Sequence, residues 1–195
     1  MTSDLPRIFL IRHGQTEWSV SGQHTGRTDV PMTPKGEDHA RRLASVLDNI
    51  KFDTVLTSPL QRTRRTCELS GLADQAQNDP DLLEWDYGSF EGLTSEAIAL
   101  KNPDWRLFRD GAPQGESIQE VATRTDRLMA KLETLSGNVA LFSHGHLICA
   151  LAMRWIGLPI LAAEHLELST SSISTIGYSE HHPDTRVISG WNSVI

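Results

Sequence analysis

The sequence predicts an α/β fold, a three-layer α/β/α sandwich with a mostly parallel central sheet. Short apolar runs at residues 8–12, 54–57 and 138–142 are typical of buried strands. Each run is followed along the chain by a stretch with apolar residues at helical spacing. Strands that alternate with helices build a parallel sheet, because each parallel connection needs a crossover and a helix supplies it.

The first strand and the helix after it have clear boundaries in the sequence. Pro6 and the turn Arg12-His13-Gly14 bound the strand, and residues 19–34 are rich in the Ser, Gly, Thr and Pro of loops. Thr33 can cap the next helix, and Pro34 suits its first position. We therefore expect a loop and then an amphipathic helix after the first strand.

The rest of the chain continues the alternation. Ser58-Pro59 follows the second strand and is expected to open a helix that ends near Gly71. Residues 75–80 are polar and are expected to be a linker, and residues 82–92 a loop or short strand. The later elements are expected to be a short helical excursion at 94–110, a turn at 111–115, helices at 117–135 and 147–156, and strands at 166–178 and 186–188.

The composition is that of an ordinary globular chain of 195 residues, 38% hydrophobic and 22% charged. We expect a single domain over residues 1–195. The net charge of −7 disfavours nucleic acid as a partner, because no basic surplus is present to pair with a phosphate backbone. The two cysteines, Cys67 and Cys149, lie in apolar helical stretches and are expected to be buried free thiols.

No stretch of the sequence has the features of a targeting or membrane-spanning segment. The apolar run after Arg7 is too short for a signal peptide and lacks a small-residue cleavage site. No run reaches the ~18 apolar residues that a membrane span needs. We therefore expect a cytoplasmic protein without membrane contact.

Two of the predicted strands end in the same way, with a histidine followed by a glycine. Arg12-His13-Gly14 follows the first strand, and Ser143-His144-Gly145 follows the third. The ends of parallel strands share one edge of the sheet, which is the usual place for a ligand site. Arg62 lies in a helix that starts at this edge and could reach the same place. Two guanidiniums and two imidazoles would bind a dianionic phosphoryl group, because arginine forks match phosphate oxygens.

Such a pocket favours nucleophilic chemistry at a histidine. Nearby positive charge lowers an imidazole pKa and keeps the ring neutral, as a nucleophile must be. Attack on a phosphoryl group would give a phosphohistidine and a leaving alcohol. A carboxylic acid can protonate that alcohol and later accept a proton from attacking water. Glu84, which has apolar neighbours, is the best candidate, with Asp86 and Glu91 as nearby carboxylates.

Six motifs with this chemistry occur in order along the chain. They are Arg12-His13-Gly14-Gln15-Thr16-Glu17-Trp18, Thr25-Gly26 with Asp29, Pro31 and Thr33, Thr57-Ser58-Pro59 with Arg62 and Thr66, Glu84 with Gly88, Glu91 and Gly92, Gly115-Glu116-Ser117, and Ser143-His144-Gly145. Over nearly its whole length the chain resembles the histidine phosphatase superfamily, in the branch of phosphoglycerate mutase-like phosphatases.

The resemblance implies a role for each matching residue. His13 matches the phosphorylated nucleophile and Glu84 the proton donor. Arg12, Arg62 and His144 match the phosphate pocket. The further candidates for substrate or phosphate binding are Ser19, Gln23, His24, Thr25, Gly26 and Tyr87, of which the last three match positions near the second end of the substrate. The resemblance implies no metal ion and no other cofactor.

Within the family, the likeness is greatest to sugar phosphatases of the sedoheptulose-1,7-bisphosphatase type. We therefore expect a metal-independent phosphatase of a small phosphorylated metabolite, and the resemblance favours a sugar phosphate or bisphosphate. True mutases of the family carry Glu-Arg-His-Tyr-Gly where this chain has Glu84-Trp85-Asp86-Tyr87-Gly88, which argues for a phosphatase.

Several alternatives stay open at this point. The chain could be a phosphoglycerate mutase or a catalytically silent binder of phosphorylated ligands. His144-Gly145-His146 has the spacing of a metal site, but neighbouring arginines would repel a cation. Arg109 is a weak candidate for a second-phosphate ligand, and a surface role is the commoner case. The substrate stays unassigned, and so does the oligomeric state, with a homo-oligomer among the options.

Overall fold

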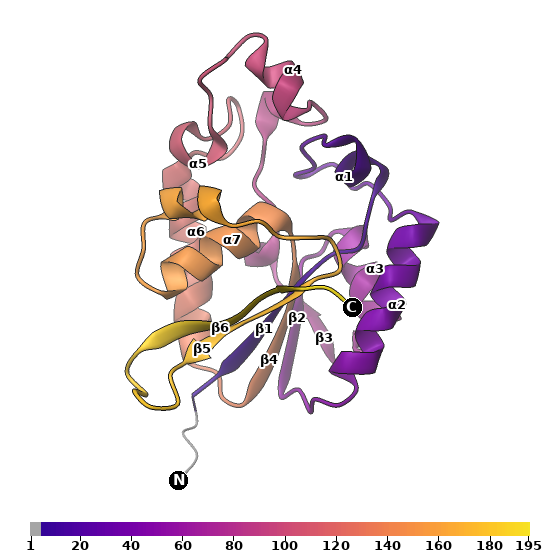
Figure 1. The fold of residues 1–195 in the computed structure, drawn as a ribbon, viewed down its shortest axis with the longest axis vertical. Coiled ribbons are helices and arrows are strands. Elements are labelled where there is room, and N and C mark those ends of the chain that lie inside the picture. The colour runs from indigo at the N-terminus through magenta and orange to yellow at the C-terminus, as the bar shows by residue number, and fades with distance from the viewer. Residues whose placement is uncertain (1–4) are drawn as a thin grey trace.

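The computed structural model describes residues 5–195, and its central feature is a six-stranded sheet (Figure 1). The strand order is β3-β2-β4-β1-β5-β6. The strands are β1 (Arg7–Arg12), β2 (Thr54–Thr57), β3 (Ala76–Asn78), β4 (Asn138–Ser143), β5 (Ile173–Tyr178) and β6 (Arg186–Ser193). The first four run parallel, while β5 is antiparallel to β1 and β6 is antiparallel to β5. The predicted mostly parallel sheet is confirmed.

Helices cover both faces of the sheet, as the sandwich requires (Figure 1). On one face lie α2 (Pro34–Leu47) and α3 (Gln61–Leu69), and on the other α6 (Ile118–Glu133) and α7 (Gly145–Trp155). Alternate β1 residues pack to opposite sides, Phe9 and Ile11 with the α2 side and Ile8 and Leu10 with the α6 and α7 side. Both strand faces are therefore buried, which explains why the strands are apolar without alternation.

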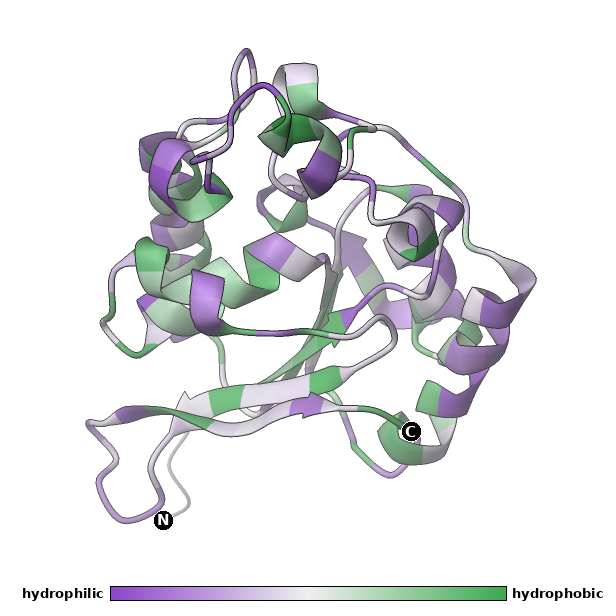
Figure 2. Cartoon of the chain, turned by 45° about the horizontal axis from the view of Figure 1, so that its top comes forward, coloured by the Kyte–Doolittle hydropathy of each residue, from purple (hydrophilic) through white to green (hydrophobic). Residues whose placement is uncertain are grey.

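Hydropathy follows the same division (Figure 2). The strands in the middle of the sheet are hydrophobic, whereas α2 is hydrophilic along its outer side and places Ala40, Leu43 and Leu47 toward the sheet. Each fully buried Leu or Ile contributes roughly 1.5–3 kcal/mol to folding. No helix within residues 5–195 has the length and apolar character needed to cross a membrane.

Short elements form a cap above the carboxyl ends of the parallel strands (Figure 1). These elements are α1 (Glu17–Ser21), α4 (Ser95–Ala99) and α5 (Leu107–Asp110). Short 3-10 segments complete the connections: η1 (Ala73–Gln75), η2 (Pro80–Leu82), η3 (Gly88–Phe90) and η4 (Ile160–His165). The cap and the sheet edge together enclose the site described below.

Four predictions about local structure are wrong. The expected loop at 19–34 overlaps α1, which is stabilised by a reciprocal capping box between Thr16 and Ser19 and ends at Gly22 with φ of 76°. The expected linker at 75–80 contains the edge strand β3. The second helix begins at Gln61 rather than Ser58. The late strands cover 173–178 and 186–193 instead of 166–178 and 186–188.

Candidate active site

The two predicted histidines meet where β1 and β4 end. The parallel register pairs Arg12 with Ser143, so the residue after each strand lies at the same level of the sheet edge. The His13 amide donates to the Ser143 carbonyl over 3.0 Å. The His13 and His144 ring centroids are 5.2 Å apart, with planes tilted by 59°. The juxtaposition that the sheet rule predicted is therefore present.

His13 is buried and held in one orientation. Its Nδ1 lies 2.8 Å from the Gly14 carbonyl oxygen, which can only accept, so Nδ1 carries the proton and Nε2 keeps its lone pair. Burial lowers the pKa of His13 well below its usual value, and the charges of Arg62 and Arg12 lower it further. A neutral ring with a free Nε2 is the form that a nucleophile needs.

Gly14 fits only because it lacks a side chain. A Cβ atom there would come within 2.7 Å of the Gly36 carbonyl oxygen at the start of α2. The Gly14 amide donates to Thr66 Oγ1 over 2.9 Å, which ties the turn to α3. The turn that carries His13 is therefore clamped between two helices.

Arg62 and His144 lie beneath His13 and are both fully buried. Arg62 Nε donates to His144 Nδ1 over 3.2 Å, and His144 Nε2 lies 2.8 Å from Ser58 Oγ. The Arg62 Nη groups donate to the carbonyls of Thr25, Gly26 and Thr28 at 2.8–3.1 Å. Burial and the Arg62 charge lower the pKa of His144 well below its usual value.

Arg12 reaches across the end of β1 toward the start of α7. Its Nη1 donates to the Leu168 carbonyl, and its guanidinium packs against Gly145, where an added Cβ would lie 3.3 Å from Cζ. Its Nε is buried and has no acceptor among residues 5–195. Burial lowers the pKa of Arg12, and the negative charge of Glu84 opposes that shift.

Glu84 sits at the amino terminus of α7. Its Oε1 accepts from the amides of Trp85 and Leu147, each over 2.9 Å, and its Oε2 accepts from the His146 amide over 3.0 Å. These amides belong to the first turn of α7 or to the adjacent residue, and first-turn amides have no partner inside the helix. Oε2 takes one protein donor where Oε1 takes two, so Oε2 has more capacity left for a substrate.

Buried Arg124 holds the segment that carries Glu84. It donates to the backbone carbonyls of Asp81, Leu83 and Glu84, and it pairs with Glu116 through two short contacts of 2.8 and 2.9 Å. Because five polar atoms converge on one guanidinium, the position of Glu84 is fixed from behind as well as by α7.

A cavity of about 260 Å³ opens in front of His13 and Glu84. Its lining includes most of the predicted site residues: Arg12, His13, Ser19, Gln23, His24, Thr25, Glu84 and Tyr87. It also includes Trp18, Gly22, Ser95, Gly145, His146, Cys149, Leu166 and Leu168. Arg62, His144 and Gly26 do not line it; they lie directly behind its wall.

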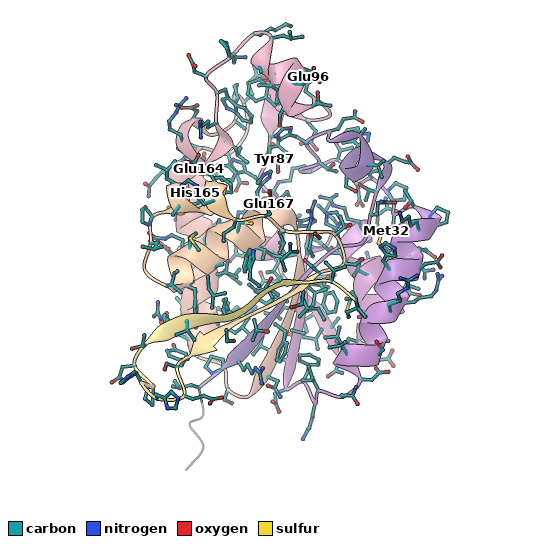
Figure 3. All side chains as sticks on the ribbon, viewed as in Figure 1. Met32, Tyr87, Glu96, Glu164, His165 and Glu167 are labelled. Carbon is teal, nitrogen blue, oxygen red and sulfur yellow. The ribbon has the colours of Figure 1, made fainter. Side chains whose placement is uncertain are left out.

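The cap side of the cavity is aromatic. The His24 ring packs against Tyr87 at 4.9 Å and lies parallel to the His146 ring at 6.2 Å, with planes 14° apart. Tyr87 Oη is hydrogen bonded to His146 Nδ1. Burial lowers the pKa of His146 to about 4 and raises the pKa of Tyr87 well above its usual value. Figure 3 shows Tyr87 in the space beneath α4, toward α7.

The other predicted cap residues have mainly structural partners. Ser19 Oγ accepts from the Thr16 amide over 2.9 Å, and Gln23 Nε2 donates to the Gly92 carbonyl over 2.8 Å. Thr25 Oγ1 donates to the Gln23 carbonyl, and the Gly26 amide donates to Glu91 Oε1. These residues shape the rim, and any contact with substrate adds to those bonds.

One residue of the cavity is not predicted from the sequence, and one candidate lies elsewhere. The sequence suggests His146 only as a metal ligand, whereas the structure places it in the first turn of α7, two residues after His144, where it lines the cavity. Arg109 lies outside the cavity, because it forms an ion pair with Asp110 and donates to the Asp104 carbonyl. Within residues 5–195, no three His, Cys, Asp or Glu side chains cluster as a metal ion would need.

Comparison with known proteins agrees with this geometry. Residues 8–192 match the family model described as histidine phosphatase superfamily, branch 1. The chain belongs to the histidine phosphatase superfamily. It is 40% identical over 179 residues to an acid phosphatase of Mycobacterium tuberculosis, covering 90% of this chain and 87% of that one.

Other members of the superfamily are similar over most of their length. A sedoheptulose 1,7-bisphosphatase of Saccharomyces cerevisiae is 37% identical, covering 82% of this chain and 71% of that one. A probable phosphoglycerate mutase of Escherichia fergusonii is 33% identical, and the match covers 95% of this chain and 89% of that one. The solved structure of an open-reading-frame product from Mycobacterium tuberculosis superposes with a TM-score of 0.90 at 36% identity, covering 96% and 97%. The phosphoglycerate mutase-like architecture is therefore confirmed.

Proposed function

We propose that the chain is a single-domain, metal-independent phosphomonoesterase that cleaves a small phosphorylated metabolite through a phosphohistidine at His13. The observation that carries the proposal is that His13, Arg12 and Glu84 face one cavity, with a neutral nucleophile, a cation and a carboxyl group in it. Membership of the histidine phosphatase superfamily supports the same chemistry.

In the first step, His13 Nε2 attacks phosphorus and the bond to the leaving oxygen breaks. Arg12, with a buried Nε that lacks an acceptor, would donate to the phosphoryl oxygens. Glu84 Oε2, carrying a proton, would transfer it to the departing alkoxide, so an alcohol leaves and the carboxylate remains. The amides of α7 then stabilise that carboxylate.

In the second step, water attacks the phosphohistidine from the side that the alcohol has left. The Glu84 carboxylate takes a proton from the water, the bond between nitrogen and phosphorus breaks, and inorganic phosphate forms. His13 Nε2 recovers its lone pair, and the proton on Glu84 is restored for the next turnover. The charges of Arg62 and Arg12 keep the field around His13 positive throughout, while the neutral His144 ring is held against Arg62.

We propose a sugar phosphate or bisphosphate as the substrate class. One relative supports this choice, since it is a sedoheptulose 1,7-bisphosphatase, while the similarity to an acid phosphatase supports phosphatase activity in general. Metal independence is supported by Arg12, because its guanidinium lines the cavity where a divalent cation would bind phosphate and would repel that cation. The charge of Arg62 behind the cavity wall adds to this repulsion.

The test is rapid mixing with a ³²P-labelled sugar bisphosphate followed by acid and base quenches. We expect a burst of label on the protein that acid releases and base does not, and we expect no burst and no turnover from His13→Ala. His39→Ala serves as the matched control and should behave like wild type, because His39 is a half-buried residue of α2 that does not line the cavity. Full activity of His13→Ala would refute the mechanism.

The similarity to a probable phosphoglycerate mutase supports a second candidate function. A mutase would return the phosphoryl group from His13 to a second hydroxyl instead of to water. Activity that depends on a bisphosphoglycerate primer and exceeds phosphatase turnover would favour the mutase. A panel with sedoheptulose and fructose bisphosphates beside the phosphoglycerates separates the two functions.

A further inference from the structure

A second cavity of about 280 Å³ adjoins the one in front of His13. The two cavities share three lining residues, His24, Ser95 and His146. The boundary between them is therefore made of side chains, the stacked pair of imidazoles and one hydroxyl. A ligand bound at His13 would have to pass only these three side chains to extend into the outer cavity.

The size of the two cavities supports joint use. Small-molecule sites usually measure roughly 300–1,000 Å³. The inner cavity, at about 260 Å³, and the outer one, at about 280 Å³, each fall just below that range, whereas together they lie within it. A leaving group of more than a few carbons needs the second space as well as the first.

The outer cavity has the lining of a ligand site. Trp105 and Phe108 supply aromatic surface, and Asn102 supplies an amide donor and acceptor. Trp105 is fixed by an indole hydrogen bond of 2.8 Å to the Gly111 carbonyl and by edge contact with Phe90 at 5.0 Å. An aromatic wall with a few polar groups suits the carbon chain and hydroxyls of a polyol.

Arg106 is the cation of this cavity. Its Nη1 lies 3.3 Å from Glu164 Oε2, and its side chain is 65% exposed, so a ligand can reach it. A pair this exposed is worth only about 0–1 kcal/mol and is easily exchanged for another anion. Arg109, three residues on, is held by Asp110 and does not line the cavity. Figure 3 shows Glu164 on η4, close beneath the cap.

We propose that the outer cavity receives the far end of an extended leaving group and that Arg106 binds a second anionic group there, as a sugar bisphosphate would present. This inference rests on the proposed phosphatase function. In the bound state Arg106 leaves Glu164 and pairs with the second phosphate, while Trp105 lies along the carbon chain. Arg106, rather than Arg109, is thus the residue that distinguishes bisphosphates from monophosphates.

The test compares KM values for sedoheptulose 1,7-bisphosphate and fructose 1,6-bisphosphate with that for p-nitrophenyl phosphate, which has no second anion. Arg106→Gln should raise KM for a bisphosphate about 10-fold or more, the effect of one charge-assisted hydrogen bond, and change KM for p-nitrophenyl phosphate less than about twofold. Arg109→Gln, the matched control, should change neither value.

Glu164→Gln should change KM for the bisphosphate in the opposite direction from Arg106→Gln. Removing the competing carboxylate should lower KM for the bisphosphate about two- to threefold, since the exchanged pair is weak. Equal effects of Arg106→Gln on both substrate types, or shifts of the same sign in Arg106→Gln and Glu164→Gln, would overturn the inference. So would a wild type that cleaves p-nitrophenyl phosphate and neither bisphosphate, with the phosphatase function intact. A wild type that cleaves no phosphomonoester refutes the proposed function itself.

Discussion

The site has a floor and a cap that are built in different ways. The floor comes from the ends of β1 and β4, the start of α3 and the segment between η2 and η3, and it consists of Arg12, His13, Arg62, Glu84 and His144. Its groups are buried and hydrogen bonded. The cap comes from short helices and connecting turns. Its charged residues are exposed and paired with one another. The proposed catalytic groups, which need exact placement, are thus held by the sheet and its flanking helices. The proposed recognition of substrate falls to cap segments that can change without disturbing those groups.

The largest effect that tests this difference between floor and cap should come from removing the carboxyl group of Glu84 in the floor. Glu84→Gln should lower kcat on sugar phosphates about 10²- to 10⁴-fold, the usual contribution of general acid–base catalysis. With p-nitrophenyl phosphate, whose leaving group departs without a proton, the first step should survive and the phosphoenzyme should accumulate. Steady-state rates and base-quenched label on the protein measure the two effects.

Asp86→Asn is the matched control, because Asp86 lies two residues away on the cap side and caps the Gly88 amide over 2.9 Å. It should keep kcat within about threefold of wild type, since a cap hydrogen bond is worth about 1 kcal/mol or less. If Asp86→Asn lost as much activity as Glu84→Gln, the proton donor would be misassigned and the division between floor and cap would fail.

His146 lies at the boundary between floor and cap and should make stability depend on pH. Unfolded, its imidazole takes up a proton near pH 6.5, but burial lowers the pKa of folded His146 to about 4. The contribution of neutral His146 to the free energy of unfolding is therefore complete above pH 6.5 and is lost as the pH falls toward 4. Between pH 7.5 and 4.5 we expect the free energy of unfolding to fall by about 2 kcal/mol because of His146.

Denaturant unfolding of wild type and His146→Asn at the two pH values measures this contribution. The variant loses the bond to Tyr87 at both pH values, so only the difference between the pH values counts. The variant should lose less stability on acidification than wild type. An identical loss in the two proteins would show that the His146 ring is solvated and that the boundary is open.

Much of the floor followed from sequence because it depends on a topological rule. Parallel strands end at one edge of a sheet, so residues 13 and 144 were expected at the same edge, and the pairing of β1 with β4 makes them neighbours. The contacts of Glu84 could not be foreseen, because they are made to amides 62 and 63 residues along the chain. The cap was less predictable still. The α1 helix depends on one capping box, and β3 is three exposed or half-buried residues at a sheet edge with no apolar signal.

Local packing around α5 also decides which arginine lines the outer cavity, Arg106 or Arg109. The sequence suggests Arg109 as a weak candidate and does not single out Arg106. The start of α5 at residue 107 and the pairing of Arg109 with Asp110 separate the two arginines in the structure. The placement of these two side chains depends on contacts between segments that are distant in the chain, and it could not be predicted from the composition.

The smallest expected effect concerns Ser58, a floor residue that contacts His144. Because Arg62 Nε donates to His144 Nδ1, the neutral His144 ring carries its proton on Nε2 and points it at Ser58 Oγ. Ser58 is therefore a positioning residue for His144. Ser58→Ala should lower kcat about 10-fold, as expected for one lost buried hydrogen bond, with KM for p-nitrophenyl phosphate nearly unchanged.

Ser70→Ala is the matched control, because Ser70 is an equally buried serine just after α3 that donates to the Cys67 carbonyl over 2.9 Å. Both variants should lose similar stability, since each loses one hydrogen bond of similar kind. Only Ser58→Ala should lose activity, and Ser58→Thr, which keeps the hydroxyl, should recover most of it. Equal activity in the two alanine variants would mean that the orientation of His144 is set by Arg62 alone.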